Sequence, residues 1–246
     1  MSLLANRFAP ITFQIGFVRA DLRAVVGQYA RWQHWFARAV ARTSVAGSLA
    51  TKLERMLPLD GDGQRVLFSS TQSPWTAVFD NRIDGGRSDS IVAVVSERLR
   101  VPGLVACDIP NTFDASKAPG SRGVWGAIAI NEYGVTETGV WGFTRSVSLR
   151  NDVSGWRFHQ MGRAWEFEDV SRYTSGAPKQ RFDEPTLLAY CESFGIRLVD
   201  AGFYDGPAVV TRSSFLFLPA RKTLGLEERQ RQIGVAAART SDGSSR

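Results

Sequence analysis

The chain has 246 residues, 43% of them hydrophobic and 22% charged, which is long enough to bury a sizeable core and typical of a globular protein. The net charge of +6 comes from the two ends: residues 1–60 carry 8 Lys or Arg against 3 Asp or Glu, residues 219–246 carry 6 against 3, and residues 61–218 carry 16 against 18. This distribution argues against nucleic-acid binding by the main body and leaves only weak, non-specific binding of a polyanion through the basic ends.

The cysteines and the N-terminal residues favour a cytoplasmic location. Cys107 and Cys191 lie far apart and form no metal-ligand or redox spacing, which is typical of small buried side chains in a reducing compartment. The apolar residues within 1–20 are interrupted by polar ones, and no small-residue cleavage site follows, so we expect no signal peptide. The longest apolar runs are too short to cross a membrane, so we expect no membrane partner.

The first 60 residues are expected to be mainly helical. Alternating apolar side chains over 11–18 predict a half-buried strand. Apolar residues then recur at helical spacing over 22–40, which predicts an amphipathic helix of about five turns with a basic outer face, capped by Asp21. A second, shorter helix is predicted over 48–57.

Strands are expected to dominate from residue 61 onward, and the short connections between the four strands predicted over 124–169 favour an antiparallel meander. The predicted strands cover 64–70, 75–81, 103–110, 124–133, 139–151, 156–161, 163–169, 196–199 and 208–219. Helices are predicted over 91–100 and, with Asp183 as its cap, over 184–194. Residues 111–123 read as a surface loop, and a loose helix over 221–239 precedes a disordered end.

Aromatic residues concentrate between residues 154 and 169, and their spacing suggests a role in the core. Alternation places Trp156 and Phe158 on one face of a strand and Arg157 and His159 on the other, while Trp165 and Phe167 share a face of the next strand. Burying a large aromatic side chain stabilises by roughly 2–3 kcal/mol, so we expect these rings in the interior and not on a binding platform.

Catalytic and metal-binding motifs are poorly represented. The sequence has no G-x-S-x-G elbow, and neither His34 nor His159 lies in a metal-ligand spacing, so we expect no metal and no cofactor. The alternative to a non-catalytic protein is a hydrolase that uses His159 or the pair Glu166 and Glu168, because two carboxylates on one strand face are the minimum for acid–base work on a glycosidic bond.

Four stretches of the body stand out together: "SPWTAVFDN" (73–81), "RSVSLRNDVSGWRFHQMG" (145–162), "FED" (167–169) and "RFDEPTLLAYCESFGIRLVDAGFY" (181–204). Over residues 65–205 the chain resembles an uncharacterised family of bacterial cytosolic proteins. That family brings no reaction or catalytic residues, so the resemblance implies no role for any single residue. The general style of the chain is also similar to immunity proteins that neutralise toxins, which is an analogy of fold and context.

The sequence thus predicts an α+β fold with a mostly antiparallel sheet and helices packed on one face. Residues 1–218 are expected to form a single domain, with 1–60 as its helical part and 61–218 as its sheet-rich body, followed by a basic, partly disordered tail over 219–246.

For function we expect a non-catalytic protein-binding role, most concretely that of a cytoplasmic immunity-type protein that occludes a toxin domain. The expected contacts are charged side chains on the wetter face of the sheet and in the surface loop: Arg122, Arg145, Arg157, His159 and Glu166. The alternatives are the hydrolase described above and a weak, non-specific nucleic-acid binder.

Overall fold

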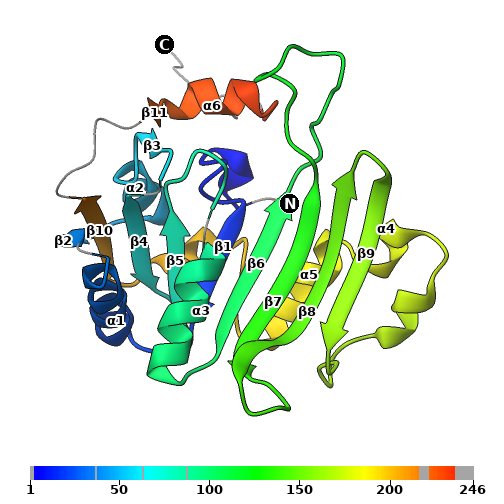
Figure 1. The fold of residues 1–246 in the computed structure, drawn as a ribbon, viewed down its shortest axis with the longest axis horizontal. Coiled ribbons are helices and arrows are strands. Elements are labelled where there is room, and N and C mark those ends of the chain that lie inside the picture. The colour runs from blue at the N-terminus through cyan, green and yellow to red at the C-terminus, as the bar shows by residue number, and fades with distance from the viewer. Residues whose placement is uncertain (1–2, 37, 63, 87, 216–221, 236–246) are drawn as a thin grey trace, which may run out of the picture.

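The computed structural model describes residues 3–36, 38–62, 64–86, 88–215 and 222–235, and within these ranges nine strands form one antiparallel sheet with helices on both faces (Figure 1). The strands of this sheet are β1 Gln14–Val18, β2 Arg38–Val45, β4 Arg65–Ser70, β5 Thr76–Asp80, β6 Gly103–Ile109, β7 Ala127–Val135, β8 Trp141–Asp152, β9 Gly155–Gly162 and β10 Ala208–Phe215. Their order across the sheet is β2-β10-β4-β5-β1-β6-β7-β8-β9. Two further strands, β3 Leu59–Asp60 and β11 Thr223–Leu224, pair with each other.

The helices of the described ranges are short to medium in length. They are α1 Leu22–His34, α2 Leu49–Glu54, α3 Ser88–Leu99, α4 Pro178–Arg181, α5 Glu184–Ser193 and α6 Leu226–Gln232, together with the 3-10 helices η1 Leu3–Asn6, η2 Val170–Thr174 and η3 Ala201–Tyr204. Asp21, Ser48 and Asp183 each accept a backbone N–H at the start of a helix, as the sequence predicts for Asp21 and Asp183. Within the described part of the chain, no helix combines the length and the apolar composition that crossing a membrane requires.

Helices α1 and α3 cover one face of the central strands (Figure 1). Val25 and Tyr29 of α1 and Val92 of α3 are buried against Val66, Phe68, Val78 and Val105 of the sheet. Two glycines let α3 lie close to the strands, because a Cβ added to Gly16 or Gly103 would come within 2.5 Å of a methyl carbon of Val92. The cover that α1 and α3 provide does not extend to β8 or β9 (Figure 1).

The opposite face carries the larger core. Side chains from α2, α5 and η3, including Leu53, Leu187 and Tyr204, pack there against residues that alternate with those of the first face. The sheet contributes Ile15, Phe17, Leu67, Phe79, Leu104, Ile130, Val147 and Leu149 to this cluster.

The α+β class with a large antiparallel sheet is confirmed, but the helices cover both faces of the sheet and not one. The reason lies in β4, β5 and β6, whose successive residues are buried on both sides (burial reaches five residues in a row in β5). Such doubly apolar strands need cover on each face.

Three predicted elements are wrong in type over all or part of their length. The helix predicted over 22–40 ends at His34, and residues 38–45 form the edge strand β2, which pairs along its whole length with β10. The strand predicted over 163–169 is irregular, and so is the one predicted over 196–199. Pairing with a distant segment overrides the local helical spacing in the first case. Of the predicted strand 208–219, residues 208–215 form β10, and 216–219 lie outside the described residues.

The remaining predicted elements occur near their expected places. The helices over 91–100 and 184–194 correspond to α3 and α5, and the predicted loop over 111–123 has no regular secondary structure. Within the loose helix predicted over 221–239, the described residues form the short strand β11 and then the helix α6, and the predicted disordered end at 240–246 lies outside the described part of the chain.

Candidate functional site

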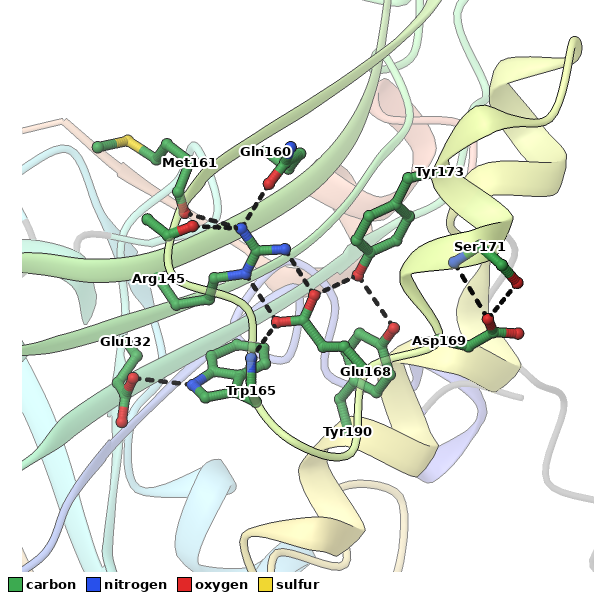
Figure 2. Close-up of polar contacts among 11 residues, drawn as sticks. Glu132, Arg145, Gln160, Met161, Trp165, Glu168, Asp169, Ser171, Tyr173 and Tyr190 are labelled. Atoms are coloured by element: carbon green, nitrogen blue, oxygen red, sulfur yellow. Dashed lines mark hydrogen bonds and ion pairs between the residues drawn. The ribbon is translucent and has the colours of Figure 1, made fainter.

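Arg145 of β8 forms a buried ion pair with Glu168, which lies in the segment that follows β9 (Figure 2). The guanidinium Nη2 lies 2.5 Å from Oε2 of Glu168, and Nε lies 2.7 Å from Oε1, so the contact is bidentate. The two side chains are only 1% and 0% exposed. Two parallel hydrogen bonds therefore join the guanidinium to the carboxylate in the interior, where both ions are desolvated.

Every remaining polar atom of the pair has a partner. Arg145 Nη1 donates to Gln160 Oε1 at 2.5 Å and to the carbonyl oxygens of Met161 and Gly162. Glu168 accepts from the backbone N–H of Trp165 at 2.9 Å and from the hydroxyl of Tyr173 at 2.7 Å. Burial tends to lower the pKa of Arg145, but the hydrogen bonds and charge of Glu168 outweigh it and raise that pKa overall.

Tyr173 and Tyr190 extend this network toward α5. Their hydroxyls lie 3.0 Å apart, and Tyr173 also donates to Glu168 (Figure 2). Burial raises the pKa of Tyr173, and the hydrogen bonds to Tyr190 and Glu168 raise it further, so the phenol stays protonated and acts as a donor.

The network explains why residues 163–169 leave the sheet. Gly162 has a φ of 83°, and a Cβ at this position would lie 2.0 Å from the carbonyl oxygen of Thr144, so only glycine fits. The chain turns away from β8 there, and Glu168 then returns to Arg145. Desolvation of Arg145 without a carboxylate partner would be costly, and this outweighs strand alternation.

The side chain of Trp165, in this loop, is fixed by a hydrogen bond from its indole N–H and by aromatic contacts of its ring. Its indole N–H donates to Glu132 Oε2 at 2.9 Å, and the same oxygen accepts from the Thr144 hydroxyl at 2.8 Å. The ring stacks on Phe167, with centroids 5.4 Å apart, and meets Phe194 edge-on. The Trp165 ring is therefore fixed in orientation while remaining half-buried.

A groove of about 800 Å³ lies between the turn that joins β7 to β8 and the loop that carries Trp165. Its lining combines two carboxylates, one guanidinium, three hydroxyls and two aromatic rings. The lining residues are Glu132, Val135, Thr136, Glu137, Thr138, Phe143, Thr144, Gly162, Arg163, Ala164 and Trp165. An open groove with a mixed polar and apolar lining therefore does lie beside Trp165, contrary to the expectation that this ring belongs wholly to the interior.

The strand edge beside the groove is open. β8 begins at Trp141, but its last pair with β9 joins Arg145 to Gly162. Residues 141–143 pair with β7 on one side, and residues 141–144 have no strand on the other side within the described ranges. Thr144 is also the extra residue of a bulge, because Glu132 faces Arg145 while Tyr133 faces Phe143.

The structure separates the residues predicted to form a contact surface. Arg157 and His159 are exposed on β9, on the face opposite Trp156 and Phe158, which pack against the core as predicted. Arg145 is buried in its ion pair, so its predicted place on the wetter face is wrong.

The other predicted contacts lie in loops. Arg122 is exposed in the loop over 111–123, where its Nε donates to the carbonyl oxygen of Lys117. Glu166 is exposed, whereas Glu168 is buried, so the two carboxylates do not share the face of a strand. The physical reason is the ion pair with Arg145, which takes both oxygens of Glu168 and turns this one carboxylate inward.

Sequence reasoning missed Glu132, Thr144 and Gly162 as components of the site. Glu132 interrupts the inward-facing apolar series of Ile128 and Ile130 in β7, and a polar residue at such a position signals a buried partner. No local pattern identifies Thr144, because its role depends on the bulge between two strands.

No group of three or more His, Cys, Asp or Glu side chains in the described residues is arranged to hold a metal ion. Cys107 and Cys191 form no disulfide, and burial raises the pKa of both thiols to about 12.

Comparisons with models of protein families, with curated proteins and with solved structures found no match to this chain. The groove beside Trp165 must therefore be interpreted from its own geometry.

Proposed function

We propose that this protein is a non-catalytic binding protein whose partner is another polypeptide, and that an extended segment of the partner adds to the open edge of β8. The observation that carries the proposal is that residues 141–144 continue past the last β8–β9 pair and stand beside a groove. An unpaired strand edge presents a row of backbone donors and acceptors, which another chain can complete.

The groove supplies contacts for side chains as well as for the backbone. Phe143 and Trp165 offer apolar surface, and Glu132, Glu137 and Arg163 offer charges of both signs. Peptides bound by strand addition obtain affinity from main-chain hydrogen bonds and specificity from side-chain pockets of this kind.

Rigidity of the loop supports the same role. The Arg145–Glu168 pair and its hydrogen bonds fix residues 162–168 against the sheet before any partner arrives. A preformed groove loses little conformational entropy on binding, which increases affinity. A buried ion pair is a weak source of net stability, so fixing the loop is the more economical explanation for it.

In its most concrete form the proposal is that of a cytoplasmic immunity-type protein that covers a toxin domain. Exposed charges at Arg122, Arg157, His159 and Glu166 would then act at the rim, where they speed encounter more than they strengthen the complex. A hydrolase based on Glu168 gains no support, because both carboxylate oxygens are already bonded inside the protein.

The experiment that tests the proposal compares single aspartate substitutions on two exposed valines. Val135 lines the groove and is 57% exposed, whereas Val153 lies at the β8–β9 turn, away from the groove lining, and is 90% exposed. Each full-length protein is immobilised and exposed to lysate of the native host. Proteins retained by the wild type are then identified, produced separately and titrated against all three chains.

We expect a purified partner that binds the wild type and Val153→Asp with equal Kd and binds Val135→Asp at least about tenfold more weakly, equivalent to about 1.4 kcal/mol. Equal binding by Val135→Asp would overturn the groove as the site. Failure of every retained protein to bind in purified form would overturn the protein-binding role. Suppression of the partner's toxic activity by the wild type tests the immunity-type form, and a partner without such activity excludes it.

A further inference from the structure

A second hollow lies at the other end of the sheet. The strands β2, β10 and β4 are neighbours there (Figure 1). Its volume is about 430 Å³, and three arginines line it: Arg55 directly after α2, Arg65 on β4 and Arg212 on β10. Its other lining residues are Thr43, Ser44, Val45, Ala46 and Val210. The lining therefore contains three guanidinium groups and no carboxylate.

Two of these arginines face each other directly. Arg65 and Arg212 are register partners in the β4–β10 pair. Both project to the face that carries α2, because each lies two positions along its strand from a residue of that core, Leu67 in β4 and Val210 in β10. Like charges directly opposite each other on neighbouring strands destabilise a sheet.

The local environment does not neutralise this repulsion. None of the three arginines forms an ion pair with another residue in the described ranges. Burial lowers the pKa of Arg65, the charge of Arg212 lowers it further, and Asp60 opposes both effects only in part. Arg65 also donates to the carbonyl oxygens of Met56 and Pro58, which hold its guanidinium in place at the wall of the hollow.

We propose that this hollow binds a phosphate-bearing small molecule, with the phosphate between Arg65 and Arg212 and within reach of Arg55. Guanidinium groups match phosphate oxygens in planar, bidentate geometry and bind them strongly where water is partly excluded. The hydroxyl of Thr43, which pairs with Val210, supplies a neutral donor on the same face, and Val45, Ala46 and Val210 supply apolar surface for the remainder of the ligand. The volume lies in the range of small-molecule sites, which is roughly 300–1,000 Å³.

This site is independent of the proposed partner groove. The groove lies at β7, β8 and the loop after β9, four or more strands away in the order of the sheet. Failure of one proposal therefore leaves the other unaffected.

The test is calorimetric titration of the full chain with inorganic phosphate, pyrophosphate and adenosine diphosphate. The test variants are Arg212→Gln and Arg55→Gln, and the matched control is Arg42→Gln, which removes the same charge from β2. Arg42 pairs with Thr211 and so lies on the opposite face of the sheet from Arg212. Arg65 is left intact because it also bonds to backbone carbonyls.

We expect the wild type and Arg42→Gln to bind pyrophosphate or the nucleotide with equal Kd and both test variants to bind at least about tenfold more weakly. Without ligand, Arg212→Gln should unfold at the same temperature as the wild type or at a higher one, since the substitution removes a repulsion. This separates loss of binding from loss of folding. Absence of binding by the wild type at millimolar concentrations of all three probes would overturn the proposal.

A single-stranded oligonucleotide provides the remaining arm of the test. Binding of the oligonucleotide alone, steeply weakened by salt and equally weakened by all three substitutions, would overturn the small-molecule site in favour of a non-specific polyanion surface.

Discussion

Arg145 and Glu168 place opposite charges side by side in the interior, with Nη2 and Oε2 2.5 Å apart and side chains 1% and 0% exposed. They come from a strand and from the loop that follows the next strand, 23 positions apart in the chain. Removing two charges from water costs several kcal/mol per ion, which their attraction and hydrogen bonds largely offset. The pair therefore determines where the loop lies more than how stable the protein is.

Glu168→Leu or Arg145→Met should each destabilise the fold by about 3–5 kcal/mol, because each leaves one buried group without its charge partner. The double variant Arg145→Met/Glu168→Leu should be less destabilised than the sum of the single variants, since it removes both buried charges. Urea denaturation followed by circular dichroism measures all four proteins of this cycle. Single variants that cost less than about 1 kcal/mol would contradict this account of the pair.

Gly103→Ala should weaken the contact between α3 and the sheet. The new Cβ would lie 2.5 Å from Cγ1 of Val92 and 2.8 Å from Oγ of Ser96, so the helix must shift, at a cost of about 1–3 kcal/mol. Val92→Ala removes the nearest methyl groups. Gly103→Ala should therefore cost less stability when it is introduced into the Val92→Ala variant than when it is introduced into the wild type. Thermal unfolding of the single and double variants tests this, and strictly additive effects would show that α3 and β6 do not meet at Gly103.

Asp183 should contribute a pH-dependent part of the stability. Burial tends to raise the pKa of its carboxyl, but hydrogen bonds from Thr186 and the charge and hydrogen bond of Arg172 outweigh it and hold the pKa below the ordinary value. A depressed folded-state pKa means that the contribution is present above the unfolded pKa, about 3.9 for Asp, and is lost as pH falls through the folded value.

Asp183→Asn should therefore be less stable than the wild type at neutral pH, by less than about 1 kcal/mol because the ion pair is partly exposed. The difference should shrink toward zero as the solution is acidified. Urea unfolding at a series of pH values measures it, and Arg172→Gln should reproduce part of the effect. A difference that grows on acidification would contradict the assigned sign.

Cys191 should have the opposite pH dependence. Burial raises the pKa of its thiol to about 12, whereas a thiol in the unfolded chain has a pKa of about 8.5. The contribution of the buried, protonated thiol to the stability of the fold is thus complete below about pH 8.5, and it is lost as pH rises toward the pKa of the folded state. Cys191→Ala should be less stable than the wild type at neutral pH, by about 1 kcal/mol, and the difference should narrow under alkaline conditions. Rapid reaction of Cys191 with a thiol reagent in the folded protein would show that it is not buried.

Much of the secondary structure could be predicted because its signals are local. Short continuous apolar runs identify β4, β5 and β6, and side-chain caps locate the starts of α1 and α5. The candidate site was less predictable: aromatic spacing placed Trp156 and Phe158 in the core correctly, but it assigned Trp165 to a strand that does not form.

The sequence by itself determined the class of the fold, the alternation along most strands and the concentration of positive charge at the ends. Only the tertiary structure decided that β10 lies between β2 and β4, that Glu168 turns inward to Arg145, and that Arg65 stands opposite Arg212. The physical reason is that periodicity and capping depend on neighbours within a few residues. Strand pairing and the desolvation of a charge depend on segments that meet only after the chain has folded.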